Sequence, residues 1–278
     1  MIGFHTNGRV ADTLDETLSR IKAAGFEYVM LDTKLAELEV AIKLAIKIGL
    51  KVHSVHLPYR QPYGHNVDNL WRSGEKNDII VNDLIGQIKT CGKYGVGVVI
   101  LHPSTRDGTL DISQGIKSLQ KILAATKASG VKIAVENLHP LENKYLRALL
   151  DNIDDPRLGF CYDCGHHYLY APEENLIGKY ANRCFAIHLH DNLMDSKGGQ
   201  SSFDIHLLPF DGKIDFEKVC RDLARSKYNG PIMIESKYNR GDAGIYCYND
   251  KSPTEFLAEA YNRGKKLAKM LDTEKSNL

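Results

Sequence analysis

The chain has 278 residues, of which 43% are hydrophobic and 26% charged, with a formal net charge of +1. This length suits two average domains or one large α/β barrel, and the composition is that of an ordinary globular protein. The near-neutral charge gives no general attraction to nucleic acid or to an acidic membrane. No apolar run approaches the roughly 20 residues that span a bilayer, and the first residues lack the pattern of a signal peptide. We therefore expect a cytoplasmic protein with no membrane partner.

Strand-like and helix-like segments alternate along the chain. IGFHT predicts a first strand, and a helix follows at about 13–24, where Thr13 and Glu16 have the spacing of a capping box. YVMLD predicts the second strand, and LAELEVAIKLAIKIG then places apolar residues on one helical face. The later strands are KVHSVHL, VGVVILH, KIAVEN, LGFCYD, FAIHLH and PIMIES, with a helix at about 78–94 among those between them. The last helix opens at Ser252 and Pro253 and runs to about 271, before a tail that we expect to fray.

These segments make about eight β-α units, and no Pro/Gly/Ser linker divides them. Such an alternation predicts an α/β fold, with residues 1–278 forming a single (β/α)8 TIM barrel domain. In barrels the working residues lie at the carboxyl ends of the strands. Two longer loops, at about 58–77 and 192–213, would rim that face.

Most of the later strands end on a histidine or an acidic residue. A buried strand has no use for a polar end unless it meets the ends of other strands, and imidazole and carboxylate are ligands of zinc and manganese. The sequence therefore predicts one convergent metal site. Its candidate ligands are Glu136, Asp163, His188 and Glu235, with His56, His102, His166, Asp204 and His206 around them. These outer five are either ligands as well or groups that support the ligands or bind substrate. His190 and Asp191 alternate with or follow His188; one of them either faces the helix layer or hydrogen-bonds a ligand, and neither is assigned to metal.

Several other features allow two interpretations. His5 is either a wall of the pocket or a surface polar group, and Trp71 either covers a sugar or pins its loop to the barrel rim. The C-x-x-C at Cys161 and Cys164 has no second pair, so we interpret both as buried apolar side chains. A phosphate nest or a solvated loop would fit Lys197, Gly198, Gly199 and Ser201.

The motifs H-x-P, E-N-L, D-x-G-H, H-L-H-D-N, D-x-H-L and a final I-E follow one another over nearly the whole chain. With them the chain resembles the xylose isomerase-like TIM-barrel superfamily, which includes sugar isomerases, ketose 3-epimerases and endonuclease IV-type abasic-site nucleases. The likeness is strong to sugar phosphate isomerase/epimerase-like proteins. It implies two arrangements of the site.

In the epimerase-like arrangement that the resemblance implies, Glu136, Asp163, His188 and Glu235 hold one divalent ion. Glu136 and Glu235 are then the catalytic acid/base pair on opposite faces of a ketose, and His166 contacts a substrate oxygen. The arginine that the family carries beyond the seventh-strand histidine is absent, since Met194 lies near that place.

In the endonuclease-like arrangement three zinc ions share nine ligands. His56, His102 and Glu136 take one ion. Glu136, Asp163, His188 and Glu235 take the second, and His166, Asp204 and His206 take the third. Every position is filled in this chain.

The sequence favours a metal-dependent isomerase or epimerase of a small sugar or sugar phosphate, with one to three ions of zinc or manganese. The alternative is a multinuclear-zinc phosphodiesterase acting on abasic DNA, which fits the ligands but needs several phosphate contacts from basic residues. The basic residues available at the rim are Arg9, Lys34, Arg60, Arg72, Lys237 and Arg240. A non-catalytic binding protein is the third reading. The oligomeric state stays open, and a homo-oligomer is compatible with the sequence.

Overall fold

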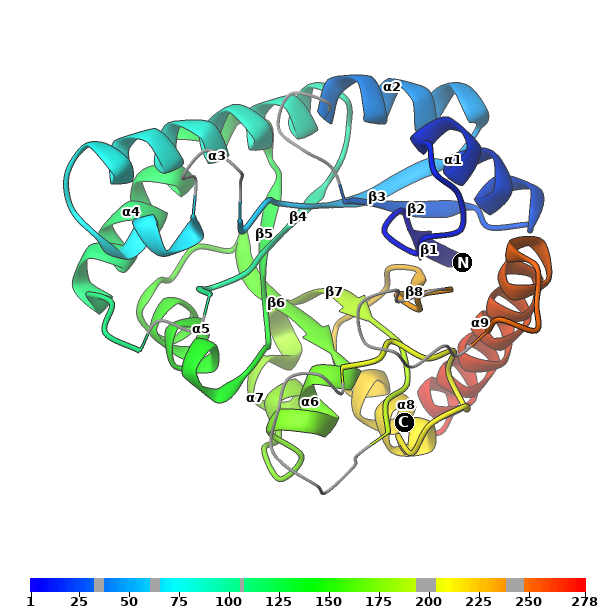
Figure 1. Cartoon of the computed structure of the whole chain (residues 1–278). Coiled ribbons are helices and arrows are strands. Elements are labelled where there is room, and N and C mark those ends of the chain that lie inside the picture. The colour runs from blue at the N-terminus through cyan, green and yellow to red at the C-terminus, as the bar shows by residue number, and fades with distance from the viewer. Residues whose placement is uncertain (33–37, 61–65, 106–107, 194–203, 239–247) are drawn as a thin grey trace.

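Eight parallel strands form the centre of the molecule (Figure 1). The computed structural model describes residues 1–32, 38–60, 66–105, 108–193, 204–238 and 248–278. The strands are β1 (Ile2–His5), β2 (Tyr28–Asp32), β3 (Lys51–His56), β4 (Val98–Leu101), β5 (Lys132–Glu136), β6 (Leu158–Asp163), β7 (Cys184–His188) and β8 (Ile232–Ile234). Each pairs with its neighbour in chain order, and β1 also pairs with β8. A bridge between Leu189 and Ile234 closes the ring, which confirms the predicted (β/α)8 TIM barrel.

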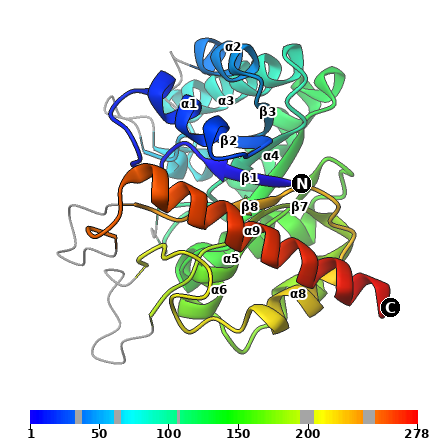
Figure 2. The ribbon, with the colours of Figure 1, turned by 90° about the vertical axis from the view of Figure 1, so that its right-hand side faces the viewer.

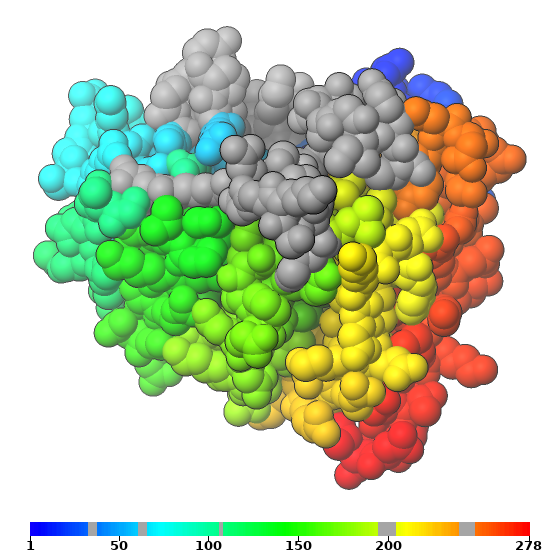
Figure 3. All heavy atoms as spheres, turned by 60° about the horizontal axis from the view of Figure 1, so that its bottom comes forward, coloured from blue at the N-terminus to red at the C-terminus, as the bar shows by residue number. Residues whose placement is uncertain are grey.

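Helices surround this ring, as the helical periodicity of the intervening segments predicts (Figure 1). They are α1 (Leu14–Ala23), α2 (Leu38–Ile48), α3 (Glu75–Lys93), α4 (Ile112–Ala125), α5 (Pro140–Asn152), α6 (Cys164–Tyr170), α7 (Leu176–Tyr180), α8 (Phe216–Ala224) and α9 (Pro253–Ser276). Figure 2 shows α9 running across the outside of β1 and β8. In Figure 3, α8 (yellow) and the end of α9 (red) are neighbours on the surface. Strands covered in this way are buried on both faces, which explains their continuous apolar runs.

The ends of the helices differ in part from the sequence predictions. Thr13 caps α1 by accepting a hydrogen bond from the Glu16 amide at 3.2 Å, whereas the Glu16 carboxylate pairs with Arg20 instead of completing a capping box. The expected frayed tail was wrong, because α9 continues to Ser276. Two features hold its last turns. The side chain of Leu271 is buried, and the Lys275 ammonium donates to the carbonyl of Tyr228 at 2.9 Å.

Trp71 pins its loop to the barrel and does not cover a substrate. It ends a short 3-10 helix (Val67–Trp71), it is 1% exposed, and its indole N–H donates to the carbonyl of Pro103 at 2.6 Å. A Cβ on Gly115 of α4 would lie 1.9 Å from Cε3 of this indole. The glycine therefore lets α4 approach the tryptophan closely.

Replacing Gly115 by alanine is expected to destabilise the protein by about 1–3 kcal/mol, because the added methyl group overpacks the indole. Urea unfolding measures the change. Gly86→Ala is the matched control, since a Cβ at this exposed position in α3 meets nothing within 4 Å. There alanine is expected to stabilise by about 0.5–1 kcal/mol through helix propensity. Equal effects of the two substitutions would contradict this account of Gly115.

Candidate metal centre

The carboxyl ends of the strands bring the predicted ligands together. Glu136, Asp163 and His188 are the last residues of β5, β6 and β7, and Asp163 lies opposite His188 in the sheet register. His56 ends β3, and Glu235 directly follows β8. Four groups of side chains in the described residues have ligand atoms within 4.8 Å of one another. Three of them together hold all nine residues predicted from the sequence: a first group of His56, His102 and Glu136, a quartet of Glu136, Asp163, His188 and Glu235, and a third group of His166, Asp204 and His206. The fourth joins His190, which was not assigned to metal, to His206 and Glu235. The other three have the membership that the endonuclease-like arrangement implies, and both arrangements stay predictions as to bound metal.

Glu136 belongs to two of the groups. Its Oε1 lies 3.2 Å from Nδ1 of His188, whereas its Oε2 lies 3.3 Å from Nε2 of His56 and 3.2 Å from Nε2 of His102. The carboxylate therefore faces the quartet with one oxygen and the two outer histidines with the other. A carboxylate placed in this way could serve two cations at once.

In the quartet, the three carboxylates all face Nδ1 of His188. Besides Glu136, Oε2 of Glu235 lies 3.2 Å and Oδ2 of Asp163 3.7 Å from the same Nδ1 atom. The third group forms around Asp204, whose Oδ2 lies 3.2 Å from Nε2 of His166 and 3.0 Å from Nε2 of His206. Each group thus presents at least one carboxylate oxygen and one imidazole nitrogen at close range.

The chemistry of these donors fits divalent cations. Oε2 of Glu235 is buried and, although it lies 3.2 Å from Nδ1 of His188, it makes no well-aligned hydrogen bond to the described residues. Three carboxylates converge on one buried imidazole in the quartet, and a buried charge without compensation costs several kcal/mol. A bound cation would supply that compensation. Mixed imidazole and carboxylate ligands suit zinc or manganese.

The electrostatics keep the acidic groups ionised. Burial opposes ionisation of Glu136, but His188 and His102 hold its pKa well below the ordinary value. Burial likewise opposes ionisation of Asp204, whose pKa His206 and His166 lower strongly. Burial by itself lowers the pKa of His166, yet Asp163 and Asp204 raise it well above the ordinary value. A cation entering the site would meet carboxylates that are already ionised and would displace a proton from His166.

Hydrogen bonds behind the ligands hold Asp163. Nε2 of His190 lies 3.1 Å from its Oδ1, so His190 contacts a ligand. The side chain of Asn137 donates to the carbonyl of Asp163 at 2.9 Å and accepts from its amide at 2.8 Å. A Cβ on Gly165 would lie 2.0 Å from Cε1 of His190, which explains the glycine of D-x-G-H. Asp191 accepts from the amides of Phe210 and Ile214, both at 3.0 Å, so it shapes the following loop.

The groups open into a cavity of about 580 Å³. Its lining includes Arg60 and Lys237 of the predicted basic rim residues, but neither Arg9 nor Arg72 among the described residues. Residues that the sequence analysis did not single out also line it: Asn7, Asp32, Tyr59, Leu138, His139, Glu142 and Tyr170. The ring of Tyr59 stacks on His102 with centroids 4.1 Å apart. Asp32 ends β2, so the rule of polar strand ends, applied to that strand too, would have found it.

The remaining candidates lie elsewhere. His5 is a core histidine and neither a pocket wall nor a surface group: its Nε2 lies 2.9 Å from the carbonyl oxygen of Ser236, and burial lowers its pKa to about 3. Cys161 and Cys164 are buried and free, as predicted, and burial raises the pKa of Cys161 to about 12.

Five features of the sequence analysis lie outside the described residues: Lys34, Met194, the segment 197–199, Ser201 and Arg240. None of the helices described here has the length and hydropathy to cross a membrane.

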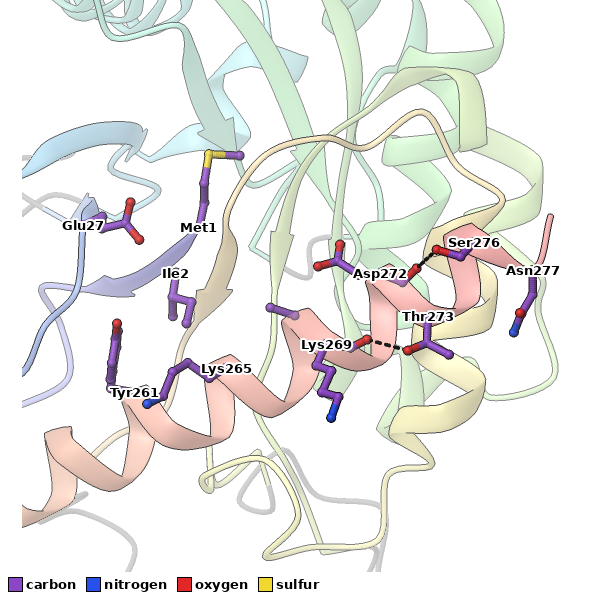
Figure 4. Close-up of a pocket in the computed structure, with 11 residues that line it drawn as sticks. Met1, Ile2, Glu27, Tyr261, Lys265, Lys269, Asp272, Thr273, Ser276 and Asn277 are labelled. Atoms are coloured by element: carbon purple, nitrogen blue, oxygen red, sulfur yellow. Dashed lines mark hydrogen bonds between the residues drawn. The ribbon is translucent and has the colours of Figure 1, made fainter.

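A second cavity, of about 650 Å³, lies between the start of β1 and α9 (Figure 4). The hydroxyls of Thr273 and Ser276 at its edge donate to carbonyls of their own helix, those of Lys269 and Asp272. This cavity lies at the amino-terminal end of β1, opposite the carboxyl-end face that carries the predicted ligands. In barrels that end contributes to stability rather than to chemistry.

Comparison with curated proteins finds relatives of several activities. An uncharacterized protein of Sinorhizobium fredii is 25% identical over 78% of this chain and 75% of its own length. Apurinic-apyrimidinic endonuclease 1 of Plasmodium berghei is 26% identical over 67% of this chain, a match that covers 41% of that protein. An inosose dehydratase of Bacillus velezensis is 32% identical over 32% of this chain and 34% of its own length. The relatives with a named activity are enzymes.

Solved structures share the fold. A D-tagatose 3-epimerase-like protein superposes with a TM-score of 0.72 at 17% identity, covering 98% of both chains. A xylose isomerase domain protein from Alicyclobacillus acidocaldarius gives a TM-score of 0.71, also at 17% identity, covering 98% of this chain and 99% of the other. The family model for the xylose isomerase-like TIM barrel matches residues 18–261. Because that match covers most of the 278 residues, the chain belongs to the xylose isomerase-like TIM-barrel family.

Proposed function

We propose that this protein is a zinc-dependent phosphodiesterase that acts on abasic-site DNA. The observation that carries the proposal is the complete set of three ligand groups, two of which share Glu136. An isomerase with one ion needs only the quartet as ligands, and it would use His56, His102, His166, Asp204 and His206 only to contact substrate or to support the ligands. The geometry thus shifts the balance away from the isomerase that the sequence alone favours. The sequence likeness to apurinic-apyrimidinic endonucleases, over 67% of this chain for the Plasmodium berghei protein, adds support.

The chain's own residues would bind and orient the phosphodiester. Ions held by the three groups would supply Lewis acidity, which activates water and stabilises charge on a leaving oxygen. Lys237 and Arg60 line the same cavity and offer positive charge to the phosphate. The buried carboxylates of Glu136 and Asp163 are fixed by their neighbours, so the site needs little rearrangement when substrate binds.

The test is incision of a duplex oligonucleotide that contains one abasic site. We expect purified protein to hold about three zinc ions and to cut the abasic strand, in keeping with multinuclear phosphodiester cleavage. Treatment with a chelator should abolish incision, and added zinc should restore it. The same duplex without the abasic site is the control substrate. A protein that carries zinc and leaves the abasic strand intact would contradict the proposal.

The second candidate is an isomerase or epimerase of a small sugar or sugar phosphate, using zinc or manganese in the quartet. It is favoured by the placement of Glu136 and Glu235, each with one oxygen 3.2 Å from the same atom of His188. Two carboxylates so close could remove a proton from a bound ketose and return it. A cavity of about 580 Å³ also lies within the range for small ligands. Exchange of a ketose proton with deuterated water, followed by NMR, tests this candidate.

A further inference from the structure

Asn192 follows β7 by four residues and is fully buried. Its side-chain oxygen accepts hydrogen bonds from the amide of Ile205 at 2.6 Å and from the amide of His206 at 3.3 Å. Its side-chain nitrogen donates to Oδ1 of Asp204 at 3.1 Å. One carboxamide therefore contacts three consecutive residues, of which two belong to the third ligand group.

These contacts decide which atoms the third group presents. Because Oδ1 of Asp204 is engaged by Asn192, Oδ2 is the oxygen that faces the rings of His166 and His206. The ring of His206 is oriented from its other side, where Nδ1 lies 2.8 Å from the carbonyl oxygen of Glu235. Hydrogen bonds to Oδ1 of Asp204 and to Nδ1 of His206 thus fix the two ligand atoms on the other side of each group, Oδ2 and Nε2. Such outer contacts orient metal ligands in proteins.

Asn192 also supports a strained backbone. His206 has a φ of 56°, in the left-handed region that residues other than glycine rarely adopt. The surrounding structure has to supply the interactions that hold this conformation. The hydrogen bonds from the amides of Ile205 and His206 to Asn192 are two of them.

We propose that Asn192 is the positioning residue of the third ion site, and that without it the chain binds two ions rather than three. The inference rests on the proposed function in that it takes the third group to be an ion site. Neither the quartet nor the group of His56, His102 and Glu136 contacts Asn192 through a hydrogen bond among the described residues. The effect should therefore be confined to one ion.

The test compares Asn192→Ala with Asn143→Ala. Asn143 is the matched control because it is equally buried and its side chain also bridges a loop, accepting from the Leu138 amide at 2.8 Å and donating to the Leu138 carbonyl at 2.9 Å. Zinc content and competition titration with a chromogenic chelator count the ions and their affinities. We expect Asn192→Ala to lower the affinity for one of the three zinc ions by about 10- to 100-fold and to leave the affinities for the other two unchanged. Asn143→Ala should lower the melting temperature but keep all three.

Three results would overturn the inference: three ions of unchanged affinity in Asn192→Ala, the same single loss in Asn143→Ala, or fewer than three zinc ions in the unaltered protein. The proposed function fails in a different way. If the unaltered protein binds three ions and Asn192→Ala binds two, yet the abasic strand is never cut, the positioning role stands and the phosphodiesterase proposal does not.

Discussion

Glu136→Gln is expected to lower incision of abasic DNA by about 10³-fold, a loss typical when a group that stabilises charge at the reacting centre is removed. Glutamine keeps the shape of the side chain but replaces one charged oxygen by an NH2 group. One oxygen of Glu136 faces His188 and the other faces His56 and His102. In either orientation of the amide, one of the two groups that share Glu136 therefore loses its carboxylate oxygen to an NH2 group. We expect the zinc content to fall together with the rate, and initial-rate assays with elemental analysis measure both.

Glu142→Gln is the control for this substitution. Glu142 lines the same cavity, but its carboxylate accepts from the His139 amide at 3.2 Å as part of a capping box, a position that glutamine also fills well. We expect its rate to stay within about twofold of the unaltered protein, because Glu142 belongs to none of the ligand groups and glutamine keeps its capping hydrogen bond. Full activity of Glu136→Gln on any substrate would argue against both candidate functions, since the isomerase also uses this glutamate.

The fold could be predicted because its signals are local. Each strand is a short apolar run and each long helix has its own periodicity, so the order of elements follows from segments read one at a time. The ends of elements were less accurate, since they depend on contacts made elsewhere in the chain. The end of α9 is an example: Lys275 donates to the carbonyl of Tyr228, 47 residues earlier.

The candidate ligands could be predicted for a related reason, because a polar residue at the end of a buried strand is visible in the sequence. The sequence suggested that His190 or Asp191 supports a ligand, but it did not show which residue does so or which ligand it contacts. His190 contacts Asp163 across 27 residues, and Asn192 reaches Asp204 across 12. No periodicity relates such pairs, so only the folded chain identifies them. Trp71 is similar, since its partner, the carbonyl of Pro103, is what decides that it pins a loop.

His102→Asn is expected to separate the two candidate functions. The ring of His102 lies 3.2 Å from Oε2 of Glu136 and stacks on Tyr59, and it takes no part in the quartet. A phosphodiesterase that uses all three groups should lose one zinc ion and about 100-fold in rate. An isomerase that uses the quartet alone keeps its ion and both glutamates. Its rate should fall by much less than 100-fold, because His102 then acts only through the pKa of Glu136.

His53→Asn is the matched control, because His53 lies on the same strand as His56, three residues before it, and its ring contacts Ser54 Oγ at 3.2 Å outside every ligand group. The zinc content and rate of this variant should stay unchanged under either function. The useful comparison is the ratio of the two variants on each substrate. If His102→Asn loses abasic incision while His53→Asn keeps it, the group of His56, His102 and Glu136 takes part in the reaction. A one-ion isomerase would not need this group. Loss of both activities in both variants would instead mean that His53 and His102 act through the stability of the barrel.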